Sequence, residues 1–495
     1  VIIFSLCLVG MATQWTFNLF EPQFLWKAYN YYFLAIIDGR LDIPTESIGS
    51  EGAYFNSKAY MYYGLLPILP RALLFPFVDL TTTPVSYFSV LLFTLLGNSF
   101  LQFYVVKTFI NKSEHSTVNH LMLFGLTVLV WFSSASFLIS QNATLYHEPY
   151  AAAICLAQIY IALLLKDGFF LSADRKITLL PYAIIAGLCV HARMPMALAL
   201  YLLTGLLMLV QSYRVLRVCN ISVSLYNLVW RSIRSFWASI VLLGLFGLSI
   251  FWLNYVKFDD PFKFMGGNYG YSFLEGFTER RCNMVPNGDF AGLLRIIANT
   301  YIYFTGDEEY HWSLTQHLQT GFGRKELPLI PLSLLWMFPI GCFAYSLFIL
   351  IKGFKHLQNK LLLVAICLAS AGAIFQLSYP TITHRYASAL WFPLFLCVLF
   401  VWYQNINLNR KLTKRRKTVI SFVLVSFSIG LVYQLKLATT DKYYLDDGPI
   451  FKHQNFHYTD EDNAFLGALT PERILTLKNE FKEQRKFECQ KLKEI

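Results

Sequence analysis

Apolar and polar positions alternate along this chain in long blocks. Runs of mostly apolar residues lie at about 1–19, 84–110, 120–140, 148–165, 178–193, 194–213, 236–256, 329–351, 361–379, 386–404 and 418–436. Several approach or exceed the ~18 residues that an apolar helix needs to cross a bilayer. The pattern predicts an all-α polytopic membrane protein with about eleven transmembrane helices. The first run lacks a basic leader and a small-residue cleavage site, so we interpret it as a span and not as a cleavable signal.

The composition agrees with this interpretation. The chain has 495 residues, of which 56% are hydrophobic and 14% are charged, and its mean hydropathy is +0.46. A soluble domain would carry roughly a quarter charged residues. The net charge of +11 therefore bears on membrane topology, and we predict no nucleic-acid partner.

The positions of basic residues predict the orientation of the spans, because short cytoplasmic loops are rich in Lys and Arg. Four such loops fall on one side of an eleven-span alternation, and this side is therefore expected to be cytoplasmic. Their basic residues are Lys166, Arg175 and Lys176; Arg214, Arg217, Arg231 and Arg234; Lys352, Lys355 and Lys360; and Arg410, Lys411, Lys414, Arg415, Arg416 and Lys417.

The polar pieces on the other side define the expected domains. Residues 1–436 form the transmembrane module, with a first outer loop at 20–83 and a central outer loop at 257–328, and residues 437–495 form an extracytoplasmic tail. Helical spacing from Pro471 to Ile495 favours an amphipathic helix that caps the outer face. Cys282 and Cys489 lie in these outer polar pieces, outside the apolar runs, and a disulfide between them is one alternative in an oxidising compartment.

The stretch from Trp26 to Leu66 is too patterned for a plain loop. Apolar residues recur at three- and four-residue steps over about 24–38, which predicts an amphipathic helix at the membrane interface. Asp38-Gly39 ends this helix, and Leu41–Pro44 forms an extended connector. A turn at Glu51-Gly52 follows. The aromatic and basic segment after it, which begins at Lys58, is expected to lead into a second juxtamembrane helix.

Ionisable residues gather at the outer ends of the apolar runs. They are His147 and Glu148, His191 and Arg193, and His384 and Arg385. Charged groups at membrane depth are costly and are therefore functional candidates. No series of acidic residues crosses the bilayer, so this pattern favours an enzyme at one interface over a transporter.

The same residues carry a resemblance to a known family. The runs AYNYYFLAIIDGRLDIP and EGAYFNSKAYMYYGLLPILPRAL resemble the first extracytoplasmic loop of GT-C fold glycosyltransferases, among them relatives of the lipid A aminoarabinose transferase and the protein O-mannosyltransferases. Gly39-Arg40-Leu41, Pro44, Gly52, Tyr54-Phe55 and Lys58 match loosely. Tyr146-His-Glu-Pro-Tyr150, Gly187 to Arg193, Asn254 to Phe262 and His384-Arg-Tyr386 are also similar. The chain departs from the family at the acidic pair that many members carry after the first span, where it has only Glu21.

The resemblance implies inverting sugar transfer from a polyprenyl-phosphate carrier to an extracytoplasmic acceptor, with a glycan, a glycolipid or a protein as the alternatives. Such a site needs a carboxylate base and cations that hold the phosphate. The base candidates are Glu51, Glu148, Asp38, Glu21 and Asp42. The phosphate candidates are Lys58, Arg193, Arg385, Lys27, His147 and His384. The candidates for aromatic contacts with sugar or lipid are Tyr54, Tyr60, Tyr62 and Tyr63.

Each candidate also has an ordinary structural interpretation. Asp38, Asp42 and Glu51 suit turns, Glu148 suits a helix N-terminus, and Lys58 suits an interface anchor whose head reaches water. No ligand cluster argues for a metal, although a divalent cation is compatible with the chemistry. The run Asp307–Glu309 is more typical of solvated surface.

Two other functions remain open at this point. An O-antigen polymerase or ligase would carry a very large outer loop late in the chain, and a flippase or transporter of lipid-linked sugars would show an internal repeat and broken, charged mid-span helices. The leading hypothesis is a cell-envelope glycosyltransferase for polysaccharide biosynthesis, in a bacterial inner membrane with its site facing the periplasm.

Overall fold

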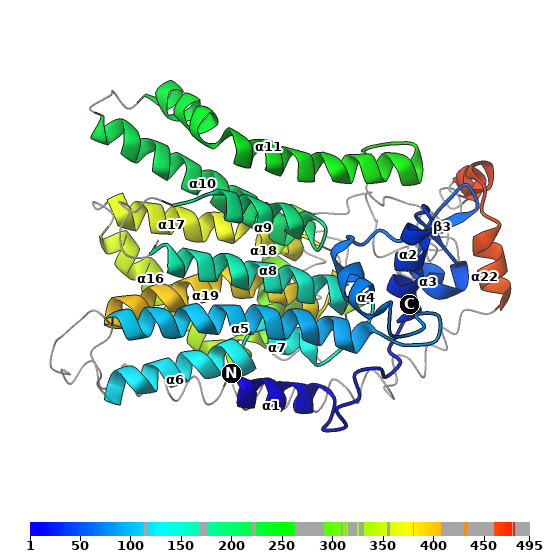
Figure 1. The fold of residues 1–495 in the computed structure, drawn as a ribbon, viewed down its shortest axis with the longest axis horizontal. Helices are drawn as coiled ribbons and strands as arrows, with labels where there is room; N and C mark the ends of the chain where they lie inside the picture. The colour runs from blue at the N-terminus through cyan, green and yellow to red at the C-terminus, as the bar shows by residue number, and fades with distance from the viewer. Residues whose placement is uncertain are drawn as a thin grey trace.

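A computed structural model describes residues 1–112, 117–168, 177–219, 224–262, 292–307, 310–311, 313–314, 324–325, 331–353, 357–379, 381–406, 430, 432, 460–477 and 479–480. The long helices lie side by side along one direction (Figure 1). Short elements from the first outer loop and the C-terminal region gather at one end of this bundle. We call that end the loop end and the opposite end, where Arg214, Arg217, Arg231 and Arg234 lie, the basic end.

The bundle consists of apolar helices in the order that the hydropathy pattern predicts. They are α1 Ile2–Ala12, α5 Ser86–Lys112, α6 Thr117–Phe132, α7 Ala135–Ser140, α8 His147–Lys166, α9 Leu180–Val190, α10 Met194–Val218, α11 Leu225–Phe258, α16 Met337–Lys352, α17 Leu357–Ala369, α18 Ala371–Leu377 and α19 His384–Ile406. Shorter elements between them are α13 Leu293–Thr305, α15 Leu332–Leu335, and the paired strands β4 Arg324–Lys325 and β5 Thr381–Ile382.

Seven helices of the described residues are long and apolar enough to cross a membrane. The apolar helices at Ile2–Ala12, Leu180–Val190 and Met337–Lys352 are shorter. The predicted eleventh run, 418–436, lies outside the described residues except for two positions. The fold is thus mostly helical and of the membrane type, as predicted, whereas the described part reaches seven full-length spans and not eleven.

The centre of the bundle is the contact between α5 and α8. In α8, 94% of the 18-residue apolar stretch that could cross a bilayer is buried inside the protein. Gly97 makes the approach close, since a Cβ there would lie 2.9 Å from the Cα of Cys155. Beside it, Asn98 Oδ1 accepts hydrogen bonds from Gln158 Nε2 (2.6 Å) and Ser136 Oγ (2.8 Å). Small residues and interhelical hydrogen bonds of this kind hold membrane helices together.

The first outer loop is a compact layer of short elements at the loop end. They are α2 Lys27–Ile37, β1 Asp42–Ile43, α3 Thr45–Ile48, the 3₁₀ turn η1 Gly49–Glu51, β2 Ala53–Phe55, β3 Lys58–Tyr60, η2 Leu66–Ile68 and α4 Leu69–Leu74. The predicted helix over 24–38 is present as α2, and Gly39 follows it with a φ of 73°. The predicted connector contains β1, and the predicted turn at Glu51 is η1.

The segment after Lys58 differs from the prediction. Lys58–Tyr60 is a strand, β3, which pairs antiparallel with β2 and β1 in the order β1-β3-β2. Asn56 and Ser57 turn the chain between β2 and β3 with φ values of 51° and 59°, as in the primed turns that favour tight hairpins. The segment does lead into a juxtamembrane helix, as predicted, and this helix, α4, begins at Leu69.

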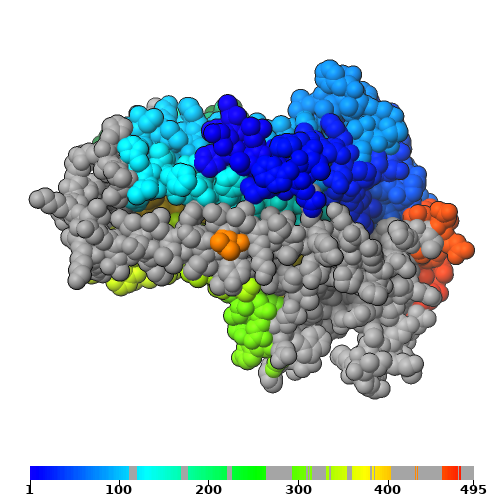
Figure 2. Space-filling view, turned by 90° about the horizontal axis from the view of Figure 1, so that it is seen from below, coloured from blue at the N-terminus to red at the C-terminus, as the bar shows by residue number. Residues whose placement is uncertain are grey.

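The C-terminal region packs on this layer. Helix α22 (Asp460–Gly467) and a helical turn at 471–477 place Leu466, Leu469, Ile474 and Leu477 in one apolar core with residues of α2, α3 and β2. The Ser57 amide donates to the Leu469 carbonyl at 2.8 Å. The orange-red C-terminal segment accordingly lies at the same end of the molecule as the first outer loop (Figure 2).

Candidate functional site

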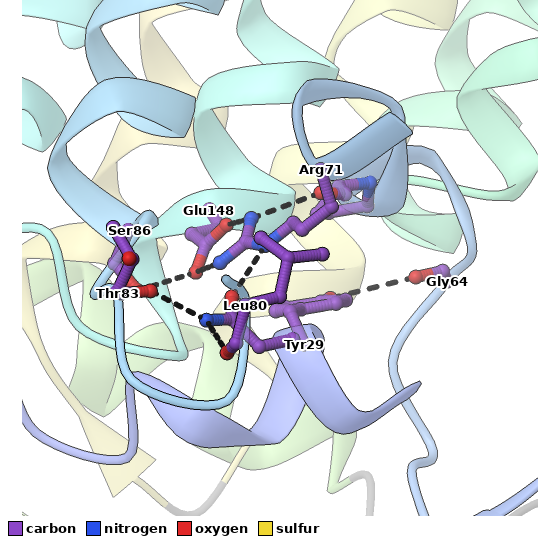
Figure 3. A network of polar contacts seen from close by, with 9 residues as sticks. Tyr29, Gly64, Arg71, Leu80, Thr83, Ser86 and Glu148 are labelled. Carbon is purple, nitrogen blue, oxygen red and sulfur yellow. Dashed lines mark hydrogen bonds and ion pairs between the residues drawn. The ribbon is translucent and has the colours of Figure 1, made fainter. Parts of the chain in front are cut away.

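A buried ion pair joins the first outer loop to the bundle (Figure 3). Arg71 of α4 and Glu148 of α8 form a two-pronged contact, in which Nη1 donates to Oε2 and Nη2 donates to Oε1 at 2.9 Å. Both side chains are almost fully buried, with exposures of 0% and 1%. Ser86 Oγ donates a further hydrogen bond to Glu148 Oε1 at 2.8 Å.

The same network reaches the first helix of the loop. Arg71 Nε donates to Asn30 Oδ1 of α2 at 3.0 Å, and the Asn30 amide nitrogen donates to the carbonyls of Leu80 and Thr83. The Arg71 guanidinium also lies 5.4 Å from the ring centre of Tyr29. Four segments are therefore fixed to one another through a single arginine.

This network argues against Glu148 as the catalytic base. Both oxygens of its carboxylate are already engaged, by the Arg71 guanidinium and the Ser86 hydroxyl. Glu148 is better understood as the residue that anchors Arg71 than as a base. Arg71 is a residue that the sequence analysis missed, although a single arginine between two prolines and an apolar helix, on the side expected to be poor in basic residues, was a usable signal.

A second group of residues, which we call the aromatic–arginine cluster, lies beside this network. It consists of Arg193 and Arg385 with Tyr62, Tyr63, Tyr146, Tyr150, Tyr379 and Tyr386. These residues come from the first outer loop, the start of α8, the turn between α9 and α10, and the segment around the start of α19. Sequence analysis proposed four of the eight; the tyrosines at 146, 150, 379 and 386 were not among its site residues.

Arg193 stands at the centre of the cluster. Its guanidinium carbon is 4.0 Å from the ring centre of Tyr150 and 5.7 Å from that of Tyr63. Its Nε is buried without a hydrogen-bond partner. An arginine stacked on rings can still present the N–H groups of its edge to a planar or tetrahedral anion.

Arg385 completes the cationic side. Its guanidinium carbon is 4.4 Å from the ring centre of Tyr146 and 5.5 Å from that of Tyr386. Tyrosine rings connect the two arginines. The ring centres of Tyr150 and Tyr386 are 6.1 Å apart, and those of Tyr63 and Tyr146 are also 6.1 Å apart. The Tyr150 hydroxyl donates to Gln376 Oε1 at 2.6 Å, which fixes that ring.

Glu51 is a carboxylate whose charge acts on two tyrosines of this cluster, Tyr62 and Tyr63. It ends η1 and is 6% exposed. Burial is the main reason that the pKa values of Tyr62 and Tyr63 are raised well above their usual range, and the negative charge of Glu51 raises both further. Both phenols are therefore protonated at neutral pH and can donate hydrogen bonds. The two hydroxyls are themselves hydrogen-bonded to each other.

Close backbone packing sets the position of the tyrosine pair. A Cβ on Gly64 would overlap the carbonyl of His191, and the amide of Leu66 donates to that same carbonyl at 2.8 Å. On the other side, Lys257 Nζ of α11 donates to the Met61 carbonyl at 2.7 Å. The segment from Met61 to Leu66 is thus held between α11 and the turn that carries Arg193.

The other charged candidates lie away from the cluster. Asp38, Arg40, Asp42 and Lys58 form a surface network in which Arg40 contacts both aspartates and Lys58 contacts Asp42 at 3.4 Å. Lys58 is 53% exposed. Exposed pairs of this kind suit the ordinary interpretation as solvated hairpin residues. Lys27 is exposed and lies over the Trp26 ring.

The remaining candidates have individual positions. Glu21 is half-buried before α2. His147 is buried, and its Nδ1 shares a hydrogen bond with Thr144 Oγ1 at 2.7 Å. Tyr54 donates to the Gly49 carbonyl within the loop core, and Tyr60 packs on Phe258. The side chain of His384 lies outside the described residues, as do Cys282, Cys489 and Glu308–Glu309. The described part of the chain contains no group of three His, Cys, Asp or Glu residues that could hold a metal.

Comparisons with known proteins returned no match to a protein-family model, to a curated protein or to a solved structure. A functional assignment for this chain therefore depends on its own residues and their geometry.

Proposed function

We propose that this chain is an integral-membrane glycosyltransferase that moves a sugar from a polyprenyl-phosphate carrier to an acceptor hydroxyl. The observation that carries the proposal is the aromatic–arginine cluster. It places two ring-stacked arginines, several phenol groups and one nearby carboxylate at the end of an apolar bundle. A polyprenyl-phosphate sugar has a lipid tail, a phosphate and a sugar. The apolar bundle suits the tail, the arginines suit the phosphate, and the phenols with the carboxylate suit the sugar and the acceptor hydroxyl.

The proposed reaction assigns a role to each group. The acceptor oxygen forms a bond to C1 of the sugar while the bond from C1 to the phosphate oxygen breaks. Glu51 takes the proton of the acceptor hydroxyl, and the polyprenyl phosphate leaves with the bonding electrons. Arg193 and Arg385 stabilise the charge that develops on the phosphate.

The tyrosines fit the sugar part of this scheme. Tyr62 and Tyr63 are protonated donors next to Glu51, and Tyr146 and Tyr150 present ring faces beside the arginines. Aromatic faces bind the apolar faces of sugar rings, and phenols hydrogen-bond sugar hydroxyls. In this proposal the Arg71–Glu148 pair takes no part in the chemistry and only positions the loop that carries Glu51.

The test uses the purified full chain with a panel of polyprenyl-phosphate hexoses and pentoses, with release of polyprenyl phosphate as the readout. Glu51→Gln should lower the rate by about 10²–10⁴-fold, which is the usual contribution of a general base. Arg193→Gln and Arg385→Gln should also lower it strongly. Lys58→Gln is the matched control, because it removes an exposed cation at the same end and should leave the rate unchanged.

Two results would contradict the proposal. Neither binding nor turnover with any such donor would exclude the substrate class. Turnover that persists in Glu51→Gln would exclude Glu51 as the base and leave Glu21, Asp38 and Asp42 to be compared by the same substitution to the amide.

A further inference from the structure

The basic end of the bundle carries a feature that glycosyl transfer does not use. Helices α10 and α11 meet there through a hydrogen bond from Ser232 Oγ to Ser212 Oγ at 2.8 Å. Arg214 and Arg217 lie just beyond Ser212 on α10, and Arg231 and Arg234 flank Ser232 on α11. Four arginines thus lie within a few residues of this contact along the two helices.

This part of the chain lacks the usual neutralising residues. No Asp or Glu occurs between Asp174 and Asp259. Arg231 is half-buried, and its Nε is shielded from solvent without a hydrogen-bond partner. A buried donor without an acceptor costs free energy, so an anionic oxygen at this place would stabilise the arrangement.

The beginning of α11 has the form of an interfacial segment. Phe236 has non-helical dihedrals (φ −124°, ψ 23°) and separates residues 225–235 from the long remainder of the helix. Tyr226 and Trp230 on this segment are 74% and 56% exposed, and Trp237 just after the kink is 64% exposed. Amphipathic aromatic rings of this kind favour the headgroup level of a bilayer, and the kink lets the segment turn relative to the span (Figure 1).

The apolar surface needed for acyl chains continues from the same place. In α11, only 17% of the 18-residue apolar stretch that could cross a bilayer is buried inside the protein. Exposed apolar residues follow the kink along the helix, including Ile240, Val241, Leu245 and Leu248. A lipid whose phosphate meets the arginines can therefore lay its chains along α11.

We infer that the α10–α11 contact at the basic end is a binding site for an anionic phospholipid, with Arg231 and Arg234 as the main headgroup ligands and Arg214 and Arg217 supporting them. The inference does not depend on the proposed glycosyl transfer. A phosphodiester supplies acceptor oxygens for several guanidinium donors at once, and basic sites between helices at a membrane surface recognise anionic headgroups.

The experiment measures lipid binding to the purified full chain by native mass spectrometry. Phosphatidylglycerol and phosphatidylcholine with the same acyl chains are added to delipidated protein. We expect phosphatidylglycerol to bind more tightly, and Arg231→Gln/Arg234→Gln to weaken it by roughly tenfold or more, given the contribution of each basic residue near an anionic surface. Arg231→Lys/Arg234→Lys should retain part of the binding, since it keeps the charge and loses the planar geometry.

Controls separate this site from general electrostatics and from misfolding. Arg40→Gln/Arg473→Gln removes two exposed, ion-paired arginines elsewhere and should bind phosphatidylglycerol as the parent chain does. The thermal unfolding of all three double variants in phosphatidylcholine should match that of the parent. Equal binding of the two lipids, or full binding by Arg231→Gln/Arg234→Gln, would overturn the inference. Displacement of the lipid by inorganic phosphate, beyond the effect of chloride at equal ionic strength, would assign the site to free phosphate instead.

Discussion

At the scale of single residues, the charges with the largest energetic consequence are Arg71 and Glu148. Both side chains are removed from water, and the charge of each is neutralised by the other. Arg71 also donates a hydrogen bond to Asn30, and Glu148 accepts one from Ser86. Removing one member of such a pair leaves an uncompensated buried charge, whereas replacing both can be nearly neutral. In the proposed reaction the role of the base is therefore assigned to Glu51 and not to Glu148.

The first prediction concerns this pair. Glu148→Gln should destabilise the folded chain by about 3–5 kcal/mol, and the double variant Arg71→Met/Glu148→Leu should recover part of the loss because no charge is left buried. Unfolding in detergent, analysed as a double-mutant cycle, measures both. Arg40→Ala breaks only exposed contacts and serves as the control with little effect. Additive losses in the cycle would show that the two side chains do not interact.

A second prediction concerns His311, which is 2% exposed. Burial lowers its pKa to about 4 from the ordinary value of 6.5. Between these two pH values the unfolded chain binds a proton that the folded chain does not, so stability should fall as the pH is lowered from about 6.5 to about 4, by up to about 3 kcal/mol. His311→Gln should make the unfolding temperature less sensitive to pH over this interval. An unchanged pH profile would contradict the burial of the imidazole.

At the scale of elements, the position of Tyr62 and Tyr63 depends on a backbone-to-backbone contact. Gly64 lies directly against the His191 carbonyl in the turn between α9 and α10, and that turn also carries Arg193. The loop and the turn can approach this closely only because residue 64 has no side chain. The contact therefore sets the distance between the tyrosine pair and the arginine.

The third prediction follows from that contact. Gly64→Ala should separate the loop from the α9–α10 turn, because backbone atoms cannot yield as a flexible side chain would. We expect a clear loss of donor binding together with a destabilisation of about 1–3 kcal/mol, as for other overpacked sites. Gly205→Ala is the control, since a Cβ there has nothing within 4 Å and alanine favours a helix. Wild-type donor binding by Gly64→Ala would mean that the loop can shift without cost.

At the scale of the whole molecule, chain segments that are distant in sequence form one layer at the loop end. Residues 26–74 and 460–477 share an apolar core that includes Leu466 and Leu469. The bundle supplies both arginines and the other four tyrosines of the aromatic–arginine cluster. They come from the start of α8, the turn between α9 and α10, and the segment around the start of α19. The aromatic–arginine cluster thus combines residues of the first outer loop and the bundle, and the C-terminal region packs against that loop.

The fourth prediction tests that assembly. Leu466 is fully buried, whereas Leu475 of the following helical turn is 62% exposed. Leu466→Ala should cost about 2–5 kcal/mol of local stability, as expected for a large-to-small change in a core, and should make the first outer loop more sensitive to limited proteolysis. Leu475→Ala should leave both properties unchanged. Equal protease sensitivity in the two variants would show that α22 does not hold the loop.

Elements with long periodic patterns could be predicted well from the sequence, and those set by local turns could not. The helix α2 and its end at Gly39 followed from spacing and from one glycine. The hairpin from Ala53 to Tyr60 was missed, because Asn56-Ser57 is a weaker turn signal than Asn-Gly and because aromatic residues suit both strands and interfacial helices. Short elements have too few residues for periodicity to decide between them.

The sequence alone determined that this is a helical membrane protein, that its ionisable residues gather at the ends of the spans, and which arginines and carboxylates are candidates for chemistry. Hydrophobic periodicity and charge bias are local properties of a chain, so they can be read in order. Only the tertiary structure decided that Glu148 pairs with Arg71, that Asp38 and Asp42 neutralise surface cations, and that Glu51 lies with Tyr62 and Tyr63. Pairing depends on distances between segments far apart in sequence, and burial at those contacts decides which charges are compensated and which stay available for a ligand.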